Sequence, residues 1–175
     1  FKNNKNISTI VQNTEYESSI GKRALEIKFD RVAPGVCSEA VVDTFFPQEL
    51  YELTGSARER FFQSYNFISC PLLYSGQNIE SEIIFKSNSQ KPITVTCFIN
   101  VFGEEDNYER INSESVVLFP DKSQKLKWKI PSTEGNPITQ VGFSIESDEA
   151  NSGSLILNYL TCLLYTSDAP TNACV

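Results

Sequence analysis

A regular alternation of apolar and polar residues is the feature that most restricts how this chain can fold. From Ile93 to Val101 an apolar residue stands at every second position, and other residues fill the places between. Because neighbouring side chains of an extended strand point to opposite faces, this alternation predicts a strand with one buried face. Residues 25–29 and 125–130 alternate in the same way. The chain is therefore expected to bury one face of each of several strands.

Further strands are predicted at residues 39–46, 78–86, 114–119, 140–146 and 154–160. Turn-forming residues separate them at 75–76, 87–89, 103–107, 120–121, 135–137 and 151–153. No segment has the pattern of a helix that would cross between parallel strands. Many short strands with polar turns predict an all-β fold, an antiparallel β-sandwich of jelly-roll type.

Residues 47–65 are the exception to the alternating pattern. Leu50, Leu53 and Phe61 recur at helical spacing, and Pro47 suits a first helical turn, but Gly55 interrupts the series. This segment is expected to be an excursion from the sandwich. Short helical turns and irregular loop both fit it.

Composition restricts the function classes. A length of 175 residues suits one domain, and a formal charge of −7 repels a phosphate backbone, so nucleic acid is not an expected partner. No apolar run reaches the roughly 18 residues of a membrane-spanning helix. With no histidine and no Cys-x-x-Cys spacing among the five cysteines, we predict no catalytic residues and no metal site. No compartment is predicted.

Two groups of residues could nevertheless bind a ligand. Aromatic residues crowd into the excursion and its exit, and rings exposed there could stack on sugars, so Tyr51, Tyr65 and Tyr74 are the predicted ligand-binding residues. The alternative is that these rings are core. The acidic run 104–106 could supply oxygen ligands to calcium, but its place between two strands favours a solvated turn.

Both ends of the chain carry unusual features. The chain begins at Phe1 and contains no methionine, so we expect that an N-terminal part is missing. Residues 162–169 resemble a translation of the transposon-end adaptor used in preparing sequencing libraries. We interpret residues 1–161 as one sandwich module and residues 162–175 as a non-native, adaptor-derived tail.

Several segments resemble the C-terminal β-sandwich of ADP-ribosylglycohydrolase family proteins, which is similar to carbohydrate-binding domains. These segments are residues 21–27, 70–77, 101–103, 131–142 and 154–161. The family usually has an aspartate where this chain has Asn158 and a tryptophan where it has Cys162. In that family a separate helical domain hydrolyses ADP-ribosyl bonds with magnesium, and no run of its catalytic residues occurs here. The resemblance therefore implies no cofactor in this chain.

The resemblance leads to a first hypothesis, a non-catalytic accessory module of an ADP-ribosylglycohydrolase-like hydrolase. Its expected partners are its own catalytic domain in the same chain and a glycan or an ADP-ribosylated target. The alternatives are a carbohydrate-binding module of a glycoside hydrolase and a purely structural sandwich domain.

Overall fold

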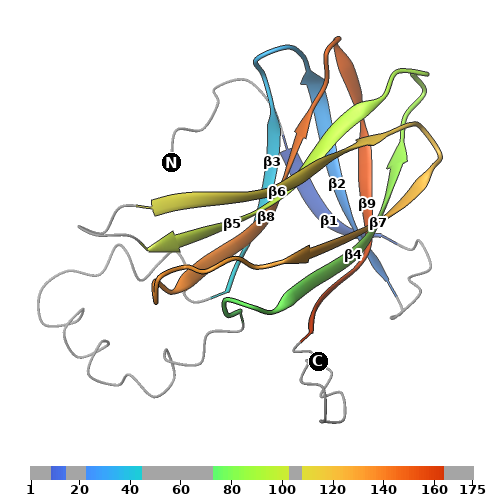
Figure 1. Cartoon of the computed structure of the whole chain (residues 1–175). Helices are drawn as coiled ribbons and strands as arrows, with labels where there is room; N and C mark the ends of the chain where they lie inside the picture. The colour runs from blue at the N-terminus through green and yellow to red at the C-terminus, as the bar shows by residue number, and fades with distance from the viewer. Residues whose placement is uncertain (1–8, 15–22, 45–72, 103–107, 164–175) are drawn as a thin grey trace, which may run out of the picture.

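The computed structural model describes residues 9–14, 23–44, 73–102 and 108–163, which form two facing β-sheets (Figure 1). One sheet has five strands in the order β1-β2-β9-β4-β7, and the other has four in the order β3-β8-β5-β6. The strands are β1 (Thr9–Thr14), β2 (Ala24–Val32), β3 (Ser38–Asp43), β4 (Asn78–Lys86), β5 (Ile93–Phe102), β6 (Tyr108–Leu118), β7 (Ser123–Lys129), β8 (Ile138–Glu146) and β9 (Asn151–Leu163).

Every strand pair in both sheets is antiparallel. The pairs β1–β2 and β5–β6 stay within one sheet, and every other connection passes from one sheet to the other. Such repeated crossing between two layers is typical of a jelly roll. The predicted fold class is therefore confirmed. Among the described residues no helix is long and apolar enough to cross a membrane.

The core lies between the two sheets, where the alternation of each strand places its apolar residues. In β4 every second residue is buried, and Ile79, Ile83 and Phe85 are each at most 1% exposed. The ring of Phe85 stacks on that of Phe29 with 6.0 Å between their centroids. The facing residues come from β5 and β8, including Val95 and Ile145. The apolar residues that alternate from Ile93 to Val101 therefore form one wall of the core.

The strand boundaries correct several predictions. β6 begins at Tyr108, six residues before the predicted strand, and β9 begins at Asn151 within a predicted turn. Both differences arise because pairing with a neighbouring strand extends the segment: Tyr108 pairs with Phe102, and Asn151 pairs with Val32. β1 was not predicted from the sequence. The excursion at 47–65 and the acidic run 104–106 lie outside the described residues.

β9 continues past Thr161, because Cys162 pairs with Ile79 and Leu163 with Asn78. Strand pairing uses only backbone groups, so it depends little on which side chains stand there. The non-native origin of residues 162–175 therefore stays a prediction. Residues 164–175 lie outside the described part of the chain.

The buried Cys97 leads to a prediction about pH. Burial raises the pKa of its thiol from 9.0 to about 12, and the nearby Cys162 adds to this rise. Above pH 9 the unfolded chain releases this proton while the folded chain keeps it. The folded state then binds more protons, so the free energy of unfolding should fall by at most about 1.4 kcal/mol per pH unit. Urea denaturation from about pH 8 to about pH 11 measures this slope.

The matched control is Cys97→Ala, which lacks the thiol. Other groups also titrate in this range, so the prediction concerns the difference between the two slopes. The variant should lose less stability per pH unit than the unsubstituted chain. Equal slopes would show that the Cys97 thiol ionises as easily in the folded protein as in the unfolded chain.

Candidate ligand-binding face

The outer face of the four-stranded sheet buries an aromatic ring that the strand pattern would leave in solvent. Phe98 alternates with the core residues Cys97 and Ile99, yet it is 0% exposed. Its partner on β8 is Gly142, where an added Cβ would come within 2.6 Å of the Phe98 ring and 2.7 Å of the Ala40 carbonyl oxygen. The missing side chain at Gly142 is what allows the ring to lie against the sheet.

Arg110 of β6 covers this ring. Its guanidinium carbon lies 3.8 Å from the centroid of Phe98, which is the geometry of a cation–π contact. The same guanidinium donates two hydrogen bonds to Glu39 of β3, of 2.6 Å and 3.1 Å to the two carboxylate oxygens. We call Glu39, Phe98, Arg110 and Gly142 together the strap, because the ion pair crosses the face above the ring and the glycine.

The strap shows that this face curves inward. β3 and β6 are opposite edges of the sheet, so three strand spacings, about 14 Å, separate them. The two ends are also displaced along the strands. Glu39 is level with Ser144 of β8, whereas Arg110 is level, through Asn100 of β5, with Gln140 of β8. Four residues of β8 separate these two levels, which is about 13 Å. Two extended side chains cannot span that diagonal on a flat sheet, so the face is concave along it.

Amide and hydroxyl groups support the strap from below. Asn100 is 4% exposed, donates to the Gln140 side chain at 2.7 Å and accepts from Nε of Arg110 at 3.4 Å. Thr139 donates to the Asn100 carbonyl oxygen at 3.0 Å. Buried polar groups bonded in this way hold one arrangement, because losing a partner would leave a desolvated group unpaired. The guanidinium is therefore held in a fixed position.

The strap remains accessible although the ring beneath it is not. The side chains of Arg110 and Glu39 are 33% and 31% exposed. The hydrogen bonds that Arg110 donates to Glu39 raise the pKa of the guanidinium, while burial acts against this rise. Three of the five N–H donors of Arg110 serve bonds between described residues, which leaves two for a ligand. A concave face with a fixed guanidinium and carboxylate can bind neighbouring hydroxyl groups.

Of the three predicted ligand-binding residues, only Tyr74 lies in the described part of the chain. It is 49% exposed and precedes β4 in a turn closed by the Gln77 amide, which donates to the Tyr74 carbonyl oxygen at 3.2 Å. The Gln77 side chain accepts from the Tyr74 amide at 2.7 Å. The turn therefore presents this ring to solvent. Tyr51 and Tyr65 lie outside the described residues, so their role stays a prediction.

None of the strap residues was predicted as a site from the sequence. One signal was present: Phe98 is the single large apolar residue on the otherwise polar side of the Ile93–Val101 alternation. Glu39 and Arg110 carried no such signal, because they are 71 residues apart and only sheet pairing brings them together.

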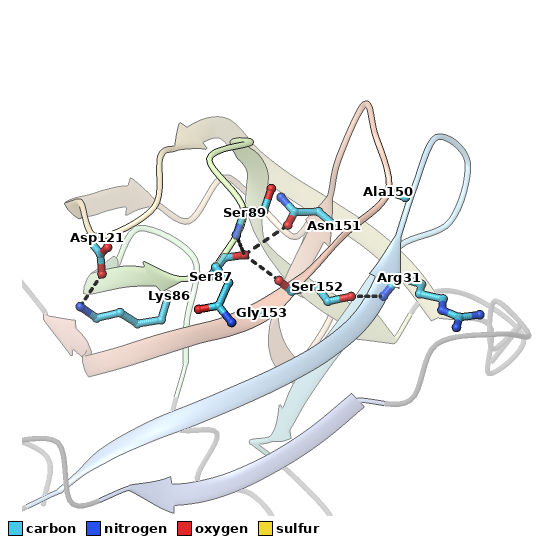
Figure 2. Close-up of a pocket in the computed structure, with 10 residues that line it drawn as sticks. Arg31, Lys86, Ser87, Ser89, Asp121, Ala150, Asn151, Ser152 and Gly153 are labelled. Carbon is cyan, nitrogen blue, oxygen red and sulfur yellow. Dashed lines mark hydrogen bonds and ion pairs between the residues drawn. The ribbon is translucent and has the colours of Figure 1, made fainter.

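A second concavity lies at one end of the sandwich, lined by residues 31, 86–89, 121 and 150–153, and its volume is about 760 Å³. Figure 2 shows that its polar groups bond to one another: Ser87 donates to the Ser152 carbonyl oxygen, and Ser152 accepts from the Arg31 amide. Lys86 pairs with Asp121 at 2.7 Å. These contacts join β2 and the turn after β4 to β9, and they join β4 to the turn before β7. A structural role therefore accounts for them.

The sequence matches no family model, and no curated protein matches it. Among solved structures, one from a study of carbohydrate-binding modules of the β-sandwich superfamily is similar, with a TM-score of 0.60 and 12% identity. The match covers 91% of this chain but only 55% of the length of that protein. A family 11 module from Clostridium thermocellum, in complex with a mixed-linked tetrasaccharide, has a TM-score of 0.52 and 9% identity, covering 89% of this chain and 82% of the module.

A third similar structure contains a family 22 module and a xylanase module of Clostridium thermocellum with xylohexaose. Its TM-score is 0.52 with 13% identity over 89% of this chain, which spans 24% of that protein. At such identities the similarity concerns the fold alone. The chain has the β-sandwich fold of carbohydrate-binding modules.

Proposed function

We propose that this chain is a non-catalytic carbohydrate-binding module that binds a neutral glycan on the concave face of its four-stranded sheet. The fold similarity supports the class, and the strap is the observation that carries the proposal. Arg110 and Glu39 offer fixed donors and acceptors to hydroxyl groups above a buried ring. We expect the contacts to be mainly hydrogen bonds, because the aromatic ring of the strap is fully covered.

A catalytic domain in the same chain is the proposed partner. The similar xylanase structure joins its module to a xylanase module, which is the arrangement that a glycoside hydrolase with a carbohydrate-binding module would have. The accessory role in an ADP-ribosylglycohydrolase-like hydrolase rests on the sequence resemblance and stays a prediction. Sequencing the gene on both sides of this segment distinguishes a glycosidase domain from a helical domain with magnesium-binding aspartates.

Calorimetric titration with xylohexaose and with a mixed-linked glucan tetrasaccharide tests the binding role. Arg110→Met should weaken the binding of whichever oligosaccharide binds by roughly tenfold to a hundredfold, because hydrogen bonds from a charged donor are lost. Methionine keeps an apolar cover over Phe98. The matched control is Arg31→Met, which removes an exposed guanidinium at the end of the sandwich.

The control variant should bind as the unsubstituted chain does. If no oligosaccharide of a broad glycan array binds, the proposed function fails and a purely structural sandwich remains. If binding is strong and Arg110→Met leaves it unchanged, the glycan binds elsewhere, and Tyr74→Ala becomes the next variant to measure.

A further inference from the structure

A groove opens between the two sheets along one side of the sandwich, beside the edge strands β6 and β7. These strands belong to different sheets, so no ladder of backbone hydrogen bonds closes this side. The volume of the groove is about 510 Å³, which lies within the range of small-molecule sites. Ile79 and Cys97 line the groove and are 1% and 2% exposed, so core residues form its floor.

The wall on the β7 side is apolar and contains the single tryptophan of the chain. Leu126 is level with Ser81 of β4, and Trp128 is level with Ile79. Both β4 residues are buried between the sheets, so Leu126 and Trp128 point between the sheets as well. Their side chains pack against the core, are only partly buried, and line the groove. An accessible indole ring therefore faces the groove.

The lysines of β7 do not give this wall a charge. They alternate with Leu126 and Trp128 and so belong to the outer face of the sheet. Lys125 is level with Glu82, and Lys127 is level with Glu80. Lys127 also pairs with Glu80 at 2.7 Å on that outer face. The side of β7 that faces the groove is therefore apolar.

A bulge in β6 gives the opposite wall two polar residues. The pairing of β5 with β6 shifts register between Thr96 and Phe98. Cys97 therefore has two residues of β6 opposite it, Ser113 and Glu114. The Cys97 amide donates to the Ser113 hydroxyl at 3.1 Å, which fixes the bulge. Because Cys97 faces the core, the bulge brings both polar residues to the edge of the groove, and both line it.

Glu114 offers an unused hydrogen-bond acceptor at the rim of the groove. Its side chain is exposed and forms no hydrogen bond or ion pair with a described residue. A carboxylate has two oxygens that only accept hydrogen bonds. Val116 adds apolar surface to the same wall. The groove thus has an indole ring on the β7 side and a carboxylate on the β6 side.

This combination favours a neutral sugar as the ligand. A pyranose ring has an apolar face of C–H groups, which suits the indole ring, and hydroxyl groups that can donate to a carboxylate. A purely apolar molecule would displace water from Glu114 and give no hydrogen bond in return, which costs free energy. An acidic sugar would be repelled by the same carboxylate.

We propose that the groove between β6 and β7 is a second glycan site. One ring of a neutral oligosaccharide lies against Trp128 and donates a hydroxyl hydrogen bond to Glu114. This inference rests on the proposed function as a glycan-binding module. It gives the module two separate sites, because the strap lies on the outer face of the four-stranded sheet whereas Trp128 points between the sheets.

The single tryptophan makes the experiment specific to the groove. Xylohexaose and the mixed-linked glucan tetrasaccharide are each added to the unsubstituted chain while the fluorescence of Trp128 is recorded. At least one of them should change this fluorescence with a saturable dependence on concentration. Because the ligand is neutral, raising sodium chloride from about 0.01 M to about 0.5 M should change the affinity by less than about twofold.

Glu114→Ala should weaken the binding detected by Trp128 fluorescence by about tenfold, because a hydrogen bond to a charged acceptor is lost. Glu109→Ala is the matched control, since Glu109 is an exposed carboxylate of the same strand that does not line the groove. This control should bind as the unsubstituted chain does. Arg110→Met acts on the concave face, so it should weaken binding there without changing the Trp128 titration.

The outcomes separate this inference from the proposed function. If neutral oligosaccharides bind in calorimetry without changing the fluorescence of Trp128, the groove is no glycan site while the binding role stands. The groove is likewise no glycan site if Glu114→Ala binds as tightly as Glu109→Ala, or if Arg110→Met abolishes the fluorescence change. If no neutral oligosaccharide binds, both proposals fail together.

Discussion

Replacing Phe85 with alanine should lower the free energy of unfolding by roughly 3–5 kcal/mol. The ring is 0% exposed, stacks on Phe29 and lies close to Gly153, where an added Cβ would come within 2.8 Å of it. Removing it takes away buried apolar surface and leaves a cavity that the two sheets can close only by moving together. Urea denaturation followed by circular dichroism measures the change.

Phe119→Ala is the matched control for this prediction. Its ring is 55% exposed in the turn between β6 and β7, so its removal should change the free energy of unfolding by about 0.5 kcal/mol or less. An equal loss in both variants would mean that Phe85 contributes no more than a surface ring and that the centre of the core lies elsewhere.

Replacing Gly142 with alanine should disrupt the concave face and lower stability together. The new Cβ would approach the Phe98 ring to 2.6 Å and the Ala40 carbonyl oxygen to 2.7 Å, and the second contact is with backbone, which cannot turn away. The ring must then lift from the sheet and displace the guanidinium above it. We expect a loss of about 1–3 kcal/mol in the free energy of unfolding. Binding of neutral oligosaccharides should weaken at the same time.

A second glycine separates steric contact from backbone strain. Gly135 has a φ of 87° and no atom within 4 Å of an added Cβ. Gly135→Ala should therefore cost about 1 kcal/mol through strain alone and leave oligosaccharide binding unchanged. If Gly142→Ala binds as tightly as Gly135→Ala, the arrangement of Phe98 under Arg110 does not matter for binding. Calorimetry at a temperature where both variants are folded makes the comparison.

Strand positions were predictable where one face of the strand meets the core and the other meets solvent. Residues 78–86 satisfy this condition, and the predicted strand has the bounds of β4. The alternation is a local property, so it can be read without knowing the neighbouring strands. β1 was missed, and the start of β9 was mistaken for a turn, because pairing with partners that are distant in sequence decides those segments.

The candidate site was predictable to a much smaller degree. Tyr74 was proposed from aromatic crowding, and the structure places its ring in solvent. Arg110 and Glu39 are ordinary surface residues in the sequence, and Gly142 resembles any strand glycine. Their association depends on the order of four strands, on the register of three pairings and on the curvature of the sheet.

The periodicity of the chain was sufficient to establish an antiparallel sandwich, because alternation determines which residues each strand buries. Tertiary structure alone brought the residues of the strap together, because the strap joins residues 39 and 110 across an entire sheet. Its geometry depends on strand order and on the curvature of the sheet. These properties arise from packing among distant segments and leave no local pattern in the sequence.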